Sequence, residues 1–196
     1  MKRTKIFKDD KGVSLIELLI VLAIIGIISG IGLPEYGRFA AKGKVRKAAT
    51  ELMQQMRMAR TMAIKENRPY LITFTPATNT YTVGFDTNLD GIPDGYGTGP
   101  VKVVNVQTNY GVDVVFGTAS YAVTPALDPN GDAINNPVAL NFRADSSSDP
   151  NEMVCFQHTG RGYTFCVELA NTAGKTNLFM WQGDIVTTTG GWTELR

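Results

Sequence analysis

The sequence predicts an α+β fold in which one long N-terminal helix, first transmembrane and then amphipathic, packs on a mainly antiparallel β-sheet domain. Three patterns support this prediction. Residues 13–33 are apolar except for one carboxylate, and residues 34–68 place apolar side chains at helical spacing. Residues 69–196 are short apolar segments separated by Gly, Asn, Asp and Pro. A helix and a sheet that each carry one apolar face are expected to bury those faces against each other.

The apolar run from Val13 to Leu33 is long enough to cross the roughly 30 Å hydrocarbon core of a bilayer as a helix. Its only charged residue is Glu17. A carboxylate inside a membrane costs about 2.5–3.5 kcal/mol on insertion scales, so Glu17 is expected to have a partner or a function. Residues 1–12 carry five Lys or Arg against two Asp, and such a basic flank stays cytoplasmic. Everything after Leu33 is therefore expected on the opposite side of the membrane.

Residues 11–18 read KGVSLIEL, and Pro34 follows the apolar run. This segment resembles the N-terminus of type IV pilins and type II secretion pseudopilins, although that family usually has Phe where this chain has Val13. The resemblance implies that residues 1–12 are a prepilin leader, and that a prepilin peptidase cleaves after Gly12 and methylates Val13. It also implies that Glu17 and Pro34 act in filament assembly, with Glu17 pairing with the α-amino group of Val13 in its own or a neighbouring subunit. An ordinary secretory signal peptide or an uncleaved signal anchor is the alternative.

The segment 34–68 is predicted to continue the helix as an amphipathic half. Its apolar residues follow one helical stripe: Val45, Ala49, Leu52, Met56, Ala59 and Ala63. Pro69 should end the helix, because the residue before a proline is disfavoured in helical geometry. The end of the segment resembles the GspH/FimT family of pseudopilins and minor pilins, at Ala59, Arg60, Ala63, Ile64, Asn67 and Arg68. Residues 38–68 carry nine Lys or Arg against two Glu, which indicates either a solvated or subunit-packing face, or contact with lipid, DNA or acidic neighbours.

The β-rich domain, residues 69–196, is predicted to be the periplasmic globular part. Its strand candidates are residues 70–75, 80–85, 101–106, 112–116, 138–143, 153–158, 163–169, 177–181 and 185–189. Pairing Cys155 with Cys166 centres a hairpin on a two-residue turn, Gly160-Arg161, of the kind that prefers Gly first. That register gathers apolar residues on one face, and it brings the two thiols within reach of a disulfide. Two free buried thiols are the alternative.

One loop carries oxygen ligands at alternate positions, as in the first half of a calcium-binding pattern. The candidate Ca²⁺ ligands are Asp86, Asn88, Asp90, the carbonyl of Ile92, and Asp94. The position of the bidentate Glu in an EF-hand is occupied by Gly97, and a solvated loop with Asp-Gly turns is the alternative. The similar run at 128–132 is predicted to be only a turn.

Residues 69–196 carry five basic against twelve acidic residues, which argues against a nucleic-acid-binding face. The sequence also has a single histidine and no phosphate loop or nucleophile motif, so we do not expect an enzyme or a cofactor other than calcium. The resemblance implies a structural minor pilin or pseudopilin of type II secretion or type IV pili, anchored in the inner membrane by one span. Its partners would be other pilin or pseudopilin subunits, the prepilin peptidase, the inner-membrane assembly platform and the lipid bilayer. A FimT-like DNA-uptake protein and an uncleaved single-span membrane protein are the competing functions.

Overall fold

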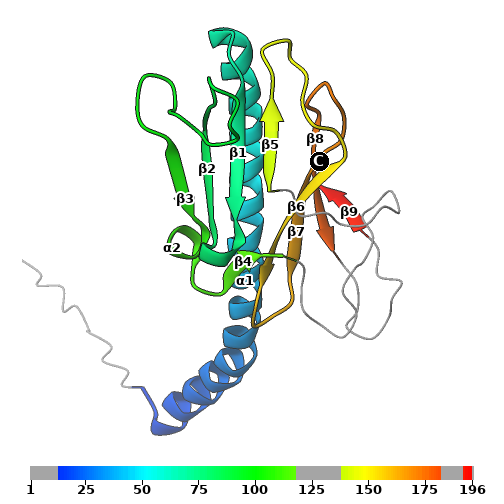
Figure 1. Ribbon diagram of the computed structural model, residues 1–196. Helices are drawn as coiled ribbons and strands as arrows, with labels where there is room; N and C mark the ends of the chain where they lie inside the picture. Colours follow the sequence, from blue (N-terminus) through cyan, green and yellow to red (C-terminus); the bar gives the residue numbers. More distant parts are fainter. Residues whose placement is uncertain (1–12, 118–137, 182–191, 196) are drawn as a thin grey trace, which may run out of the picture. The chain divides into compact units, whose positions relative to one another are not determined.

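The computed structural model describes residues 13–117, 138–181 and 192–195 (Figure 1). It divides into two compact units, Met1–Phe39 and Ala40–Arg196, which are described separately below. The α+β prediction is confirmed, since a long helix and antiparallel sheets make up the chain. Three predicted features lie outside the described residues: the leader with Gly12, the strand at 185–189 and the turn at 128–132.

Helix α1 spans Leu15–Glu66, close to the predicted limits, and its backbone stays helical through Pro34. It ends where the sequence indicates. Asn67 adopts a left-handed conformation with φ of 50°, and the N–H of Arg68 donates to the carbonyl of Ala63 at 3.3 Å. This is the hydrogen bond of a Schellman cap, which satisfies a carbonyl that the last turn would leave free. Pro69 then begins the extended chain.

The predicted apolar stripe of α1 is confirmed within the second unit. All six of its residues are fully buried, and Ala41 and Ala48 of the same helix are buried as well. The six residues and Ala48 belong to one cluster with side chains from the strands that follow, and Figure 1 shows this part of α1 running along the strands. The helix is therefore part of the core of the domain, because its small and apolar residues let the strands approach closely.

The strands form two antiparallel sheets rather than the single sheet that the pattern suggested. The first has the order β3-β2-β1-β5, with β1 (Tyr70–Thr75), β2 (Thr80–Phe85), β3 (Lys102–Asn105) and β5 (Ala139–Phe142). The second has the order β4-β6-β7-β8-β9, with β4 (Val114–Phe116), β6 (Glu152–His158), β7 (Thr164–Leu169), β8 (Thr176–Trp181) and β9 (Trp192–Leu195). A short 3₁₀ turn, η1 (Pro76–Thr78), joins β1 to β2.

Several strand predictions were too long by one or two residues, and for two of them the local reason is clear. The candidate at 101–106 stops at Asn105 because helix α2 (Val106–Tyr110) begins there, and the Asn105 side chain accepts from the N–H of Thr108 at 2.8 Å. This is an N-cap, which ends the strand by starting the helix. The candidate at 112–116 begins only at Val114, because a turn in which the N–H of Val114 donates to the carbonyl of Gly111 precedes it. Strand β9, which begins at Trp192, had no counterpart in the prediction.

The cysteine hairpin has the predicted register and a different turn. Strands β6 and β7 pair in that register, and Cys155 and Cys166 form a disulfide with Cα atoms 4.0 Å apart. A type II′ turn needs a positive φ at Gly160, whereas the structure has the positive φ (65°) at Gly162. Since the N–H of His158 donates to the carbonyl of Tyr163, the loop has four residues, 159–162. A four-residue loop with the same centre preserves the register.

The hairpin separates two apolar clusters, one on the face that the alternation predicted to be apolar and one on the opposite face. Val154, Phe156 and their partners on β7 face the main core, while the disulfide lies in a second cluster with Met153 and Phe179. His158 is a packed imidazole: it is 7% exposed, and its Nδ1 accepts from the N–H of Gly160 at 3.2 Å.

Candidate functional site

From Val13 to Ile28 the first unit presents an apolar helix surface whose one charged residue is Glu17. From Val13 to Ile28, its large apolar side chains are between 50% and 78% exposed. Helix α1 is the one described helix that is long and apolar enough to cross a membrane. Apolar surface of this extent is normally covered by lipid or by a partner, because water around it is unfavourable. The segment is thus suited to a bilayer and to packing against other helices.

Glu17 lies in the first turn of this helix, where the macrodipole favours a negative charge. Its N–H donates to the carbonyl of Ser14 at 3.0 Å, which fixes the start of α1. The side chain forms no ion pair or hydrogen bond with any residue that the structure describes, and Ile16 and Leu18 beside it are exposed. In lipid this carboxylate would need a cation from outside the described residues. The α-amino group of Val13 is the predicted partner, and this pairing stays a prediction.

A second site lies where α1 ends, at residues of the segment that resembles the GspH/FimT family. The guanidinium of Arg68 stacks on the Phe85 ring with 3.5 Å to the ring centroid, and it donates to the carbonyl of Gly97 at 2.9 Å. Its Nε donates to the Glu66 carboxylate at 2.7 Å. The hydroxyl of Tyr70 donates to the same carboxylate at 2.8 Å and accepts from the N–H of Gly97. Arg68 therefore fastens the loop after β2 to the end of the helix.

The hydrogen bonds of this site shift its ionisation. The Tyr70 hydroxyl, followed by the Arg68 guanidinium, lowers the pKa of Glu66 below its ordinary value of 4.5. The carboxylate in turn raises the pKa of Arg68. Burial raises the pKa of Tyr70. These shifts favour an ionised Glu66, which accepts both hydrogen bonds, and a neutral Tyr70, which donates one of them. Arg68 was singled out in the sequence, but its partners Phe85 and Gly97 were not, because they come from a distant strand and loop.

The five predicted calcium ligands lie in the loop that Arg68 fastens: Asp86, Asn88, Asp90, Ile92 and Asp94. Asp86 is buried, and its carboxylate accepts from the N–H groups of Asp90 at 3.3 Å and Gly91 at 2.9 Å. The carboxylate of Asp94 accepts from the N–H of Thr87 at 2.8 Å. The side chains thus bond the loop's own backbone, as Asp does in turns. Among the described residues no group of three or more His, Cys, Asp or Glu could hold a metal ion, and calcium binding stays a prediction.

Comparison with known proteins points to one family. A model of the type II transport protein GspH matches residues 48–174, and a model of the prokaryotic N-terminal methylation motif matches residues 7–33. Among solved structures, the minor pseudopilin EpsH from the type 2 secretion system of Vibrio cholerae is similar with a TM-score of 0.45 and 11% identity. That match covers 70% of this chain and 97% of EpsH.

Curated relatives are similar mainly over part of their length. A fimbrial protein of Pseudomonas aeruginosa is 35% identical over 100 residues, which are 51% of this chain and 63% of that protein. The type IV major fimbrial protein FimA of Dichelobacter nodosus is 47% identical over 50 residues, 26% of this chain and 31% of FimA. The chain thus spans less than two thirds of the curated relatives it matches. Because the GspH model alone covers residues 48–174 of 196, the chain belongs to the GspH family of type II transport proteins and carries a type IV pilin-like N-terminal methylation motif.

Proposed function

We propose that this protein is a minor pilin or pseudopilin, a structural subunit that is anchored in the inner membrane and joins a periplasmic filament. The filament would serve type II secretion or type IV pilus assembly. The observation that carries the proposal is the exposed apolar helix that follows the methylation motif and holds one carboxylate, Glu17, in its first turn. The GspH family is a family of structural pilin-like subunits rather than enzymes.

The same helix surface would be used before filament assembly and during it. Before assembly, it lies in the bilayer, where its length matches the hydrocarbon core. During assembly, it packs against helices of other subunits, and Gly26 and Gly30 permit close approach because they carry no side chain and the space around both is open in the single chain. A prepilin peptidase would first remove residues 1–12 and methylate Val13, and an inner-membrane platform would then add the subunit to the filament.

Glu17 would give the assembly its direction. Burying an ionised carboxylate is unfavourable unless a cation compensates it. The α-amino group of Val13 in a neighbouring subunit would supply that cation after cleavage, as the family resemblance implies. Pairing of this kind sets the axial register between two subunits, because no other position along the apolar run offers a charge.

The experiment compares two substitutions on the same helix. Glu17→Ala removes the buried charge, so the variant should insert into membranes at least as well as the unchanged chain, yet fail to crosslink or co-purify with partner pilins. Glu35→Ala is the matched control, since Glu35 lies outside the apolar run and pairs with Arg38 at 3.4 Å. It should insert and assemble normally. Normal assembly of Glu17→Ala would contradict this function for the carboxylate.

DNA binding is the second candidate function, and one observation favours it. Lys42, Lys44, Arg46 and Lys47 are all exposed on α1, in a segment with no acidic residue between positions 40 and 50. The acidic balance of residues 69–196 opposes it. DNA binding of this kind would weaken steeply with salt. A gel-shift titration of the full chain and of Arg46→Glu/Lys47→Glu, in low and physiological salt, tests it.

A further inference from the structure

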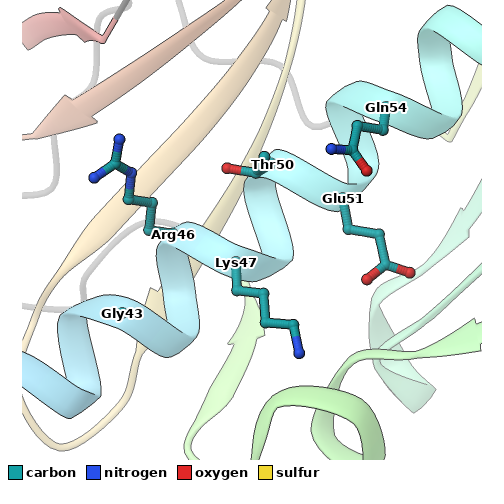
Figure 2. A pocket seen from close by; sticks show the side chains of 6 residues that line it. All are labelled: Gly43, Arg46, Lys47, Thr50, Glu51 and Gln54. Atoms are coloured by element: carbon teal, nitrogen blue, oxygen red, sulfur yellow. The ribbon is translucent and has the colours of Figure 1, made fainter.

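Four cations form a collar around α1 at the start of the second unit: Lys42, Lys44, Arg46 and Lys47. All four side chains are exposed, whereas Val45 and Ala48 among them are buried in the main core cluster. Figure 2 shows Arg46 and Lys47 extending to opposite sides of the helix, and the next carboxylate along it is Glu51. None of the four cations forms an ion pair with a residue that the structure describes. The collar is therefore a positive surface on both sides of α1.

The loop after α2 lies at the same end of the unit, as Figure 1 shows. Helix α2 ends at Tyr110, and the ammonium of Lys44 lies against the next residue, Gly111, 3.3 Å from the position that a Cβ there would occupy. Val112 follows, and its side chain is 75% exposed. The collar therefore has an exposed apolar residue beside it, and basic and apolar groups in one surface are typical of proteins that bind the headgroup region of a membrane.

The turn between β6 and β7 lies at this end as well (Figure 1). Its exposed Arg161 adds a fifth cation. The N–H of Thr159 joins the turn to the loop after α2, because it donates to the carbonyl of Asp113 at 2.8 Å. The carboxylate of Asp113 is also here, 3.9 Å from Nε2 of His158. Among the described residues, cations thus outnumber carboxylates at what we call the basic end of the unit.

Carboxylates gather at the other end, where α1 ends. Figure 1 shows the loop after β2 and the loop after β5 at that end. The loop after β2, residues 86–94, is called the acidic loop. The two loops carry six carboxylates: Asp86, Asp90, Asp94, Asp145, Asp149 and Glu152. Cations on or next to these loops only partly offset them: Lys65, Arg68, Lys102 and Arg143. Arg68 is paired with Glu66, and Arg143 is paired with Asp149 at 3.0 Å. The second unit is thus electrically polarised from one end to the other.

The collar begins close to the end of the apolar run. About nine residues of helix, or roughly 14 Å at 1.5 Å per residue, lead from Leu33 to Lys42. This is the largest separation of the two residues at any angle between the units. The headgroup layer extends about 5–8 Å beyond the hydrocarbon core. Attraction between charges reaches roughly 8 Å further at physiological salt. The start of the collar is therefore within electrostatic reach of the headgroups.

We propose that the basic end of the second unit binds anionic phospholipid headgroups of the membrane that α1 crosses. The collar and Arg161 contact the phosphates, and Val112 enters the headgroup layer. The same surface repels the acidic loop, so the unit is held with that loop away from the membrane. The proposal rests on the membrane anchoring in the proposed function, and it adds a lipid-dependent orientation of the domain before assembly.

A membrane matches this end of the unit better than DNA, the other polyanion considered for these cations. A membrane surrounds the helix that emerges from it, so it can meet cations on both sides of α1 together with Arg161. It also accepts an apolar side chain at Val112. A duplex would contact the collar from one side, and its phosphates offer Val112 no apolar partner.

The test uses the full chain in vesicles of phosphatidylcholine alone, or of phosphatidylcholine mixed with phosphatidylglycerol. Both contain the same fraction of lipid with a spin-labelled headgroup. Val112→Cys carries a fluorophore at the basic end, and Cys155 and Cys166 do not react because they are paired. The spin label should quench this fluorophore roughly threefold or more strongly in the anionic vesicles, and high salt should remove the difference. The matched control, Leu89→Cys on the acidic loop, should be quenched little in either vesicle.

Charge reversal then tests the collar. Lys42→Glu/Arg46→Glu in the Val112→Cys chain should remove most of the extra quenching, because the anionic surface then repels these positions. Both side chains are exposed, so Tm in detergent should stay unchanged, which shows that the variant is folded. Lys65→Glu/Lys102→Glu makes the same charge change near the acidic end, and it should leave the quenching as it is.

Three results would overturn the proposal: equal quenching at Val112 in both kinds of vesicle, quenching at Leu89 as strong as at Val112, or quenching that is insensitive to reversal of Lys42 and Arg46. If the chain still floats with the vesicles, the anchoring in the proposed function stands without this contact. A chain that floats with neither kind of vesicle would contradict the anchoring itself. Equal quenching together with a DNA gel shift that Lys42→Glu/Arg46→Glu abolishes would assign the collar to DNA instead.

Discussion

Leu52 lies in the middle of the buried stripe of α1, and its truncation measures how much the helix contributes to the domain. The side chain is fully buried in the main core cluster. Replacing a buried leucine by alanine costs about 2–5 kcal/mol, because transfer free energy is lost and a cavity remains. In a domain of this size, each kcal/mol lowers Tm by about 2–4 °C. Leu52→Ala should therefore lower Tm by about 10 °C.

The assay is thermal unfolding of the full chain in detergent, followed by near-UV circular dichroism. The edge-to-face pair of Trp181 and Trp192, with ring centroids 5.0 Å apart, supplies a signal from folded sheet. Met58→Ala is the matched control on the same helix, since Met58 is 48% exposed and its truncation should change Tm by little. Equal shifts for the two variants would refute the assignment of the buried face.

Three further predictions concern the loops and the hairpin. Cys155→Ser/Cys166→Ser should lower the free energy of unfolding by about 3 kcal/mol, because the disulfide closes a loop with a sequence separation of 11. Urea unfolding measures this loss, and the unchanged chain under reducing conditions should show the same loss. If the predicted ligands hold one Ca²⁺ ion in the folded state alone, Tm should be higher in millimolar calcium than in chelator, and a Tm that is the same in both would contradict the predicted cation site. Arg68→Met should lower Tm at pH 7. Because the folded pKa of Glu66 lies below its ordinary value of 4.5, the part of this loss that comes from the Arg68–Glu66 pair should be present above pH 4.5 and vanish as the pH falls through the folded value. A Tm difference that is the same at pH 3 and pH 7 would show that Glu66 is not Arg68's partner.

Most of the fold could be predicted from the sequence because its signals are local. The stripe from Val45 to Ala63 has helical spacing, and the hairpin register follows from alternation and from the two cysteines. The division into two sheets could not be predicted, because strand partners far apart in sequence leave no local pattern. Helix α2 was missed because its only signal is the cap at Asn105, inside an apolar run typical of a strand.

The functional residues divide in the same way. Glu17 could be found from the sequence, because a lone carboxylate in an apolar run is conspicuous without any tertiary information. The partners of Arg68 could not be found, since Phe85 and Gly97 reach it only through the folded sheet and loop. The exposure of Leu89 at the tip of the acidic loop was also hidden. The carboxylates of Asp86 and Asp90 accept backbone N–H groups of the loop, which the sequence did not indicate, and their predicted binding of calcium stays a prediction.

The central claim, that this chain is processed and assembled as a pilin-like subunit, is tested most directly by one mass measurement. The full-length gene is expressed in cells with an active prepilin peptidase, and the protein is extracted from membranes for intact mass and N-terminal sequencing. The account predicts a chain that lacks residues 1–12 and begins at Val13 with one added methyl group. Recovery of the uncut chain, beginning at Met1, would contradict it.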